Sequence, residues 1–167
     1  MSLVETATDH ELSSVTRGLR DQLRDQLSPE CIITDRTRLR TYECDAITGY
    51  RVVPSLVALP ESTAEVAAVV AACAAQGVPF VARGAGTGLS GGALPVADGV
   101  VICLARMRRV LDIDLPNQRM TVEPGVTNAD ISRAVAAHDL YYAPDPSSQT
   151  VCTIGGNIAE NSGGAHC

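Results

Sequence analysis

The most informative segment of the chain is RGAGTGLSGG at residues 83–92, which holds five of the chain's fourteen glycines. A second window, GGNIAENSGG at residues 155–164, holds four more. Each window follows an apolar, extended-looking segment, and glycine at this density is typical of backbone that bends sharply or approaches another group closely. Rows of backbone N–H groups in such loops bind anions, so the two windows predict a phosphate or pyrophosphate site within a large nucleotide-cofactor site.

The first window formally matches the pattern G-x-G-x-x-G at residues 86–91, which is a weak signal taken alone. A dinucleotide-binding Rossmann turn opens directly into a helix, whereas Pro95 and Gly99 follow this window closely and disfavour one. No Lys-Ser or Lys-Thr pair follows Gly91, which excludes a Walker A loop. We therefore expect a strand–loop–strand turn, and an NAD-binding Rossmann enzyme would require a helix after Gly91.

Polar side chains in the first window suit the same anion. We expect Thr87 and Ser90 to donate to a pyrophosphate, and Arg83 either to pair with a phosphate or to brace the loop. A plain surface turn is the alternative, although a turn does not need so many glycines.

The second window is expected to be a short helix or an extended segment with glycines at both ends. Its small residues suit close approach to a flat ring or a ribityl chain, and Asn157 and Asn161 can each donate and accept hydrogen bonds. Tight packing against a neighbouring helix is the alternative. The preceding residues 144–148, PDPSS, form a rigid loop that can present backbone groups to a ligand.

Composition narrows the class of protein. The chain has 167 residues, 46% of them hydrophobic, only 3% aromatic, and a net charge of −6, which disfavours nucleic-acid binding. Its six cysteines form no C-x-x-C pair, which is typical of reduced thiols in a cytosolic protein. The longest apolar run, residues 66–75, is too short to span a bilayer.

The first half of the chain predicts a parallel sheet. Leu12, Val15, Leu19 and Leu23 repeat at helical spacing and predict an amphipathic helix that ends near Pro29. Residues 52–59 are apolar, and their proline makes them an edge strand or an extended entry segment. A capping box at residues 62–65 opens a helix that ends at Gly77, and a strand follows at residues 78–82. Strand, helix and strand form a βαβ unit with parallel strands.

The second half predicts smaller elements. We expect a strand at residues 100–104, a hairpin of residues 110–114 and 120–123, and a helix capped by Thr127 that extends to about His138. Residues 142–150 read as a polar loop. Residues 1–50 are interpreted as an N-terminal helix with a lead-in segment, and residues 51–167 as part of a cofactor-binding domain.

The two glycine windows together resemble a known family. RGAGTGLSGG, followed by APDPSSQTVCTIGGNIAENSGGAHC at residues 143–167, resembles the FAD-binding domain of the p-cresol methylhydroxylase and vanillyl-alcohol oxidase flavoproteins. Within that group the chain is most similar to the FAD-binding subunit of glycolate oxidase and to D-lactate and D-2-hydroxyglutarate dehydrogenases. YECDA at residues 42–46 and VVPSLVALPESTAEVAAVV at residues 52–70 also resemble this group.

The resemblance implies an α+β fold of two lobes with FAD between them. It implies that the first loop cradles the FAD pyrophosphate and that the second segment lies along the ribityl and isoalloxazine portions. The cofactor-binding residues that it implies are Arg83, Gly84, Ala85, Gly86, Thr87, Gly88, Leu89, Ser90, Gly91, Gly92, Pro144, Asp145, Pro146, Thr153, Gly155, Gly156, Asn157, Ala159, Asn161, Ser162 and Gly163.

The resemblance also implies a reaction, the oxidation of a 2-hydroxy acid such as glycolate or D-lactate to the 2-oxo acid by hydride transfer to flavin N5. The implied partners are that small acid and an iron–sulfur or other electron-transfer subunit, in the cytoplasm or peripheral to the inner membrane. Family members are much longer, so we expect an N-terminal piece without catalytic residues or metal ligands. A non-catalytic flavin- or nucleotide-binding module is the competing hypothesis.

The sequence leaves the roles of two further residues open. Cys152 either lines the cofactor or is a buried small hydrophobic residue. His166 lies next to the second window and either contacts the flavin or has no role in the site.

Overall fold

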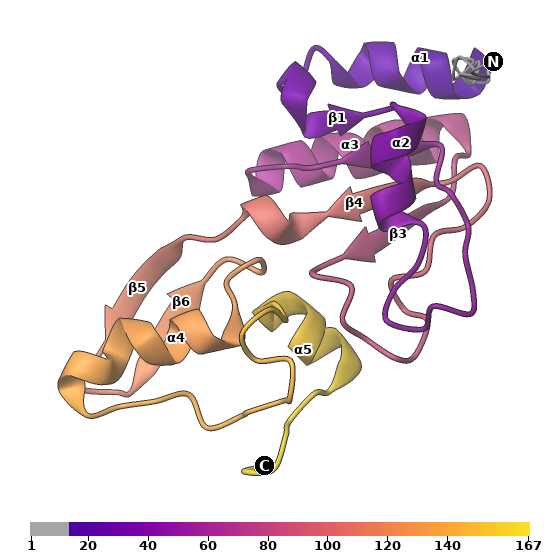
Figure 1. Cartoon of the computed structure of the whole chain (residues 1–167). Coiled ribbons are helices and arrows are strands. Elements are labelled where there is room, and N and C mark those ends of the chain that lie inside the picture. Colours follow the sequence, from indigo (N-terminus) through magenta and orange to yellow (C-terminus); the bar gives the residue numbers. More distant parts are fainter. Residues whose placement is uncertain (1–13) are drawn as a thin grey trace, which may run out of the picture.

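A computed structural model describes residues 14–167, which form two lobes (Figure 1). The first lobe is a four-stranded sheet with helices, and the second is a two-stranded hairpin with the helix α4 (Asn128–Val135). The helix α5 (Ile154–Glu160) lies between them. Each lobe has its own cluster of buried apolar side chains. This arrangement confirms the expected α+β fold of two lobes.

The four-stranded sheet has the order β1 (Ile32–Ile33), β2 (Leu56–Ala58), β4 (Val100–Cys103), β3 (Phe80–Arg83). β2 and β3 both pair with β4 in parallel, whereas β1 is antiparallel to β2. All residues of β2 and β4 are buried because these strands occupy the middle of the sheet, where parallel strands read as continuous apolar runs.

The expectation that residues 52–59 form an edge strand is wrong, because β2 lies between β1 and β4. Pro54 precedes the strand instead of interrupting it, so no ladder hydrogen bond is lost. The alternative expectation, an extended entry segment, describes residues 52–55 correctly. The sequence analysis missed β1, which is only two residues long.

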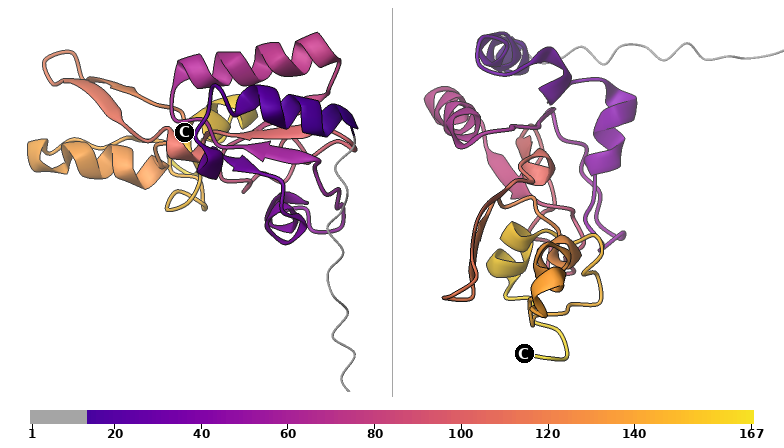
Figure 2. Two further views of the ribbon diagram at one scale, coloured as in Figure 1. Left: turned by 90° about the horizontal axis from the view of Figure 1, so that it is seen from above. Right: turned by 90° about the vertical axis from the view of Figure 1, so that its left-hand side faces the viewer.

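The helix α3 (Thr63–Gln76) has the ends that the sequence predicts. The Ser62 side chain accepts a hydrogen bond from the Glu65 amide at 3.2 Å, and Gly77 ends the helix in the left-handed region at φ 64°. α1 (Ser14–Leu23) lies beside α3 (Figure 2), and Gln76 Nε2 donates to Gln22 Oε1 at 2.8 Å. Leu19 and Leu23 are buried as expected, whereas Leu12 lies outside the described residues.

Short elements connect these parts. They are the 3-10 turns η1 (Pro29–Cys31), η2 (Arg40–Tyr42), η3 (Leu104–Arg106) and η4 (Ala136–His138), and the short helix α2 (Arg36–Leu39). α1 ends at Leu23, several residues before Pro29, and the proline opens η1.

The second lobe contains the expected hairpin. β5 (Val110–Asp114) pairs antiparallel with β6 (Arg119–Val122), and the Thr127 side chain caps α4 by accepting a hydrogen bond from the Asp130 amide at 3.2 Å. No helix follows Gly91, because the element after β3 is β4. The connection of residues 84–99 is therefore a strand–loop–strand turn, as expected, and the Rossmann alternative does not apply.

Candidate cofactor-binding site

The first glycine loop leaves β3 at Arg83 and turns back toward β4. Gly86 and Gly91 have positive φ angles of 72° and 80°, which side chains with a Cβ rarely adopt. Among residues 14–167, no group accepts a hydrogen bond from the backbone amides of Ala85 through Gly92. The loop thus presents a row of free donors, which is the geometry that binds an anion.

Arg83 braces this loop. Its side chain is buried, and its Nη1 donates to the carbonyl oxygens of Cys44 at 2.7 Å and Ala93 at 3.4 Å. Its guanidinium lies 5.7 Å from the ring centre of Tyr42, and a Cβ added at Gly86 would overlap it. These contacts favour the bracing role over the phosphate-pairing role that the sequence left open.

The second glycine segment forms α5 and does not run extended. Thr153 precedes the helix, but its hydroxyl caps none of the helix amides, and this buried oxygen has no hydrogen-bond partner among the described residues. The Ile154 and Gly155 amides donate to backbone carbonyls of Val126 and Pro124 at 2.8 and 2.9 Å. No acceptor among residues 14–167 lies opposite the Gly156 amide. The start of α5 therefore has an unpaired hydroxyl and an unpaired amide.

A buried asparagine pair holds α5 to the second lobe. Asn157 Nδ2 donates to Asn128 Oδ1 at 3.0 Å, and Asn128 Nδ2 donates to the Pro144 carbonyl at 2.8 Å. Asn128 is fully buried, so these hydrogen bonds stabilise the site strongly. Asn161 ends the helix in the left-handed region and is exposed.

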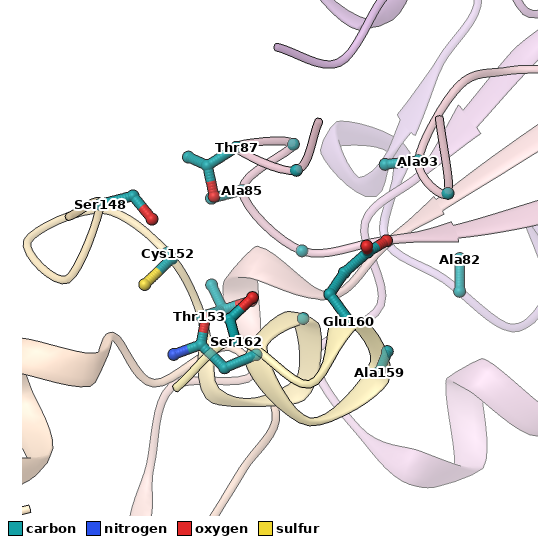
Figure 3. A pocket seen from close by; sticks show the side chains of 16 residues that line it. Ala82, Ala85, Thr87, Ala93, Ser148, Cys152, Thr153, Ala159, Glu160 and Ser162 are labelled. Atoms are coloured by element: carbon teal, nitrogen blue, oxygen red, sulfur yellow. The ribbon is translucent and has the colours of Figure 1, made fainter. Parts of the chain in front are cut away.

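The two glycine segments enclose one cavity of about 120 Å³ (Figure 3). Eleven of the residues expected from the sequence line it: Gly84, Ala85, Gly86, Thr87, Gly88, Gly92, Thr153, Gly156, Asn157, Ala159 and Ser162. Cys152 also lines the cavity and is buried, as expected of a small hydrophobic residue, and its contact with the cofactor stays a prediction. The two bends, far apart in sequence, lie side by side as a shared binding site requires.

The remaining expected residues lie elsewhere. A neighbouring hollow of about 290 Å³ is lined by Pro144, Asn161 and Gly163, together with Asn157 and Ser162 of the cavity. The others outside the cavity are Arg83, Leu89, Ser90, Gly91, Asp145, Pro146 and Gly155. Of these, Leu89 is exposed, and Gly155 packs against Pro124, where an added Cβ would meet the Pro124 Cβ at 2.8 Å.

Asp145 holds the last residues of the chain in place. Its Oδ1 accepts from the His166 amide at 3.0 Å, and its Oδ2 lies 2.6 Å from His166 Nδ1. The hydrogen bond from the His166 amide, and then that from the imidazole, hold the pKa of Asp145 below its ordinary value. His166 does not line the cavity, and its structural partner is Asp145.

Four further residues line the cavity without having been expected from the sequence: Ala82, Ala93, Ser148 and Glu160. Glu160 and Ser148 lie within segments singled out from the sequence, but no pattern there indicated their contact with the loop. Ala82 and Ala93 carry no chemical signal at all. Among the described residues, no three His, Cys, Asp or Glu side chains are grouped so as to hold a metal ion. Residues 14–167 also include no helix long and apolar enough to cross a membrane.

Residues 54–167, which include both glycine segments and the cavity between them, match the family model described as an FAD binding domain. The chain belongs to the FAD-binding domain family. It is 50% identical over 159 residues to the glycolate oxidase subunit GlcD of Escherichia coli strain K12. The matched region covers 95% of this chain and 31% of that relative. It is 32% identical over 158 residues to a D-lactate dehydrogenase of Anaerostipes hadrus, and this match covers 94% of this chain and 33% of that relative. The chain thus spans about a third of the length of these relatives.

Solved structures show the same fold. p-Cresol methylhydroxylase with substrate bound superposes with a TM-score of 0.75 at 21% identity, over 87% of this chain and 29% of that one. A 4-ethylphenol oxidase of Gulosibacter chungangensis, in complex with isoeugenol, superposes with a TM-score of 0.74 at 25% identity. This superposition covers 89% of this chain and 30% of the oxidase chain. The resemblance to the p-cresol methylhydroxylase type of FAD-binding domain, seen in the glycine windows, is therefore confirmed.

FAD is the cofactor of this family, and the residues around the cavity fit a part of it. Ala85, Gly86, Thr87, Gly88, Gly92 and Gly156 line this cavity, and their amides have no acceptor among the described residues. These donors suit an anionic group with several acceptor oxygens. Pockets that enclose a whole ligand measure roughly 300–1,000 Å³, so a cavity of about 120 Å³ has room for only a section of FAD.

Proposed function

We propose that this chain supplies part of the FAD site of an oxidoreductase that oxidises a 2-hydroxy acid of the glycolate or D-lactate type to the 2-oxo acid. The observation that carries the proposal is the single cavity between the two glycine segments, lined by donors without acceptors. The names of the relatives, glycolate oxidase subunit GlcD and D-lactate dehydrogenase, support the reaction.

The first step that the chain performs is binding of the FAD pyrophosphate. The amides of residues 85–88 and of Gly92 donate to the phosphate oxygens, and the Thr87 hydroxyl and the Gly156 amide add further donors. Arg83 keeps the loop in its bent shape from beneath, so the donors are preorganised before the cofactor arrives.

The neighbouring hollow provides a continuation for the ribityl and ring portions. It shares Asn157 and Ser162 with the cavity, so an elongated ligand can extend from one into the other. Asn161 and Ser162 would offer polar groups to the ribityl hydroxyls, and Gly163 would permit close approach of a flat ring. FAD, once bound, supplies the chemistry by accepting a hydride from the α-carbon of the acid.

Partners and location follow from the same relatives and from the thiols. Two of the relatives are named as subunits, which supports an electron-transfer partner for this chain. All six cysteines are free thiols, which supports a reducing compartment such as the cytoplasm.

Titration of the full chain with FAD, followed by flavin fluorescence, tests the binding site. Bound flavin should be retained by the wild-type chain and lost in a Gly86→Val variant, because Gly86 has a positive φ and a side chain there would overlap Arg83. Anaerobic addition of glycolate or D-lactate then tests the reaction through loss of flavin absorbance. Flavin binding without reduction by either acid would show that this chain by itself supplies only the binding site, and absence of binding would contradict the site.

A further inference from the structure

Glu160 is the one charged side chain among the described residues that line the cavity. It is the last residue of α5 and extends from the helix toward the glycine loop (Figure 3). Its Oε2 accepts a hydrogen bond from Ser90 Oγ. A Cβ added at Gly92 would overlap its Oε1, and a Cβ at Gly88 would lie 3.7 Å from its Cδ. The carboxylate therefore lies within the bend of the loop.

Nothing in the helix itself favours a carboxylate at this position. Glu160 occupies the C-terminal end of α5, where the partial negative charge of the helix dipole disfavours an acidic side chain. Among residues 14–167 it forms no ion pair with any Lys, Arg or His. The one hydrogen bond that the loop gives this carboxylate comes from the Ser90 hydroxyl, because none of the amides from Ala85 to Gly92 donates to it.

Under the proposed function, a diphosphate bound to the loop amides would lie in the same bend as this carboxylate. A diphosphate and a carboxylate held a few ångströms apart repel each other, and no cationic side chain lines the described cavity to offset this repulsion. Both groups cannot occupy the loop at once.

We propose that Glu160 is an internal place-holder for the anion. In the ligand-free chain its carboxylate occupies the bend of the glycine loop and closes the loop onto α5 through Ser90. Entry of a diphosphate group displaces it into solvent. This inference rests on the proposed FAD site, and it adds that the site is self-inhibited until the latch formed by Ser90 and Glu160 opens.

The structure allows this displacement. Ser90 and Glu160 are both exposed, and a single hydrogen bond joins their side chains. Exposed contacts of this kind contribute little to stability, so the latch can open without unfolding either element. Gly91, with a φ of 80°, and Gly92 follow Ser90 and give the loop backbone freedom to move.

The test compares the wild-type full chain with Glu160→Gln and Ser90→Ala. Asp98→Asn is the matched control, because Asp98 is an exposed acid of the same loop segment outside the cavity, at a φ of 57° that asparagine also adopts. Each protein is titrated with FAD, with inorganic pyrophosphate and with riboflavin, which has no phosphate. The first two probes distinguish a site for the whole cofactor from a site for any diphosphate.

Glu160→Gln should bind FAD and pyrophosphate roughly tenfold more tightly than the wild type, since one like charge is removed at short range. Ser90→Ala should give a smaller gain, and Asp98→Asn none. Riboflavin affinity should be the same in all four proteins. Without any ligand, hydrogen exchange of the Ala46 and Leu94 amides, which donate to the loop carbonyls of Gly88 and Gly91, should be faster in Glu160→Gln and Ser90→Ala than in the control.

Equal FAD and pyrophosphate affinity in the wild type and Glu160→Gln would overturn the place-holder while leaving the FAD site intact. Weaker binding by Glu160→Gln would overturn it as well, because Glu160 would then be a ligand of the cofactor. Unchanged hydrogen exchange in both latch variants would show that no latch exists. Absence of FAD binding by every protein would instead overturn the proposed function, and the inference with it.

Discussion

The hydroxyl oxygen of Thr153 lies directly against the α-carbon of Gly84, so closely that a Cβ at residue 84 would overlap it. This contact joins the two glycine segments at the entrance of α5. It also leaves the Thr153 oxygen buried without a hydrogen-bond partner among the described residues. The close approach, more than backbone flexibility, explains the glycine at this position, because Gly84 is not among the glycines with a positive φ.

Gly84→Ala should therefore destabilise the chain by about 1–3 kcal/mol, as overpacking in a closely packed contact does. Chemical denaturation measures the loss. The double variant Gly84→Ala/Thr153→Ala should recover most of it, because the next contact of the added methyl, Thr153 Cβ, is at an ordinary 3.5 Å. A double variant no more stable than Gly84→Ala alone would contradict the proposed contact.

Asn128→Ala should cost roughly 2–4 kcal/mol of unfolding free energy, since it leaves the buried Asn157 amide and the Pro144 carbonyl without their partners. Denaturant titration measures this cost. Asn117→Ala is a suitable control, because Asn117 is an exposed asparagine of the hairpin turn, where only a local contact with Asp114 is lost. Similar losses in the two variants would contradict the role of the buried pair.

Arg83→Lys should loosen the glycine loop and cost about 1–3 kcal/mol, because lysine cannot reproduce the planar contact with Tyr42 together with both carbonyl contacts. The expected readouts are weaker FAD binding and faster hydrogen exchange of the Ala46 and Leu94 amides, which donate to the loop carbonyls of Gly88 and Gly91. Retention of wild-type exchange with reduced FAD affinity would instead favour direct pairing of Arg83 with a phosphate.

The segment of residues 163–166 should loosen in acid. The His166 amide and imidazole lower the pKa of Asp145, so its folded-state pKa lies below the unfolded-state value of about 4. The stabilising contribution of ionised Asp145 is therefore complete above that value and is lost as the pH falls through the lower folded-state pKa. Hydrogen exchange of these residues as a function of pH measures the effect, and Asp145→Asn should abolish its pH dependence.

Several elements could be predicted from short stretches of sequence because short-range physics specifies them. Ser62 and Gly77 mark the ends of α3 through local capping, and Thr127 does the same for the start of α4. The absence of a helix after Gly91 follows from Pro95 and Gly99. The glycine loop was recognisable as a site because clustered glycines serve few purposes other than sharp bends and close contacts.

Strand order was not predictable in the same way. β4 lies between β2 and β3, and this placement moved residues 56–58 from the expected edge into the middle of the sheet. β1 was missed because two isoleucines give no periodicity, and only their pairing with Val57 and Ala58 makes them a strand.

Short stretches of sequence were enough to specify the local elements, the two glycine segments and the flavoprotein family, since each depends on residues close together in the chain. Only the tertiary structure decided which glycine faces Thr153, which donors stay free, and that Glu160 enters the loop beside Ser90. Those relationships join residues from different lobes. They depend on how the lobes pack together, which no short stretch of sequence specifies.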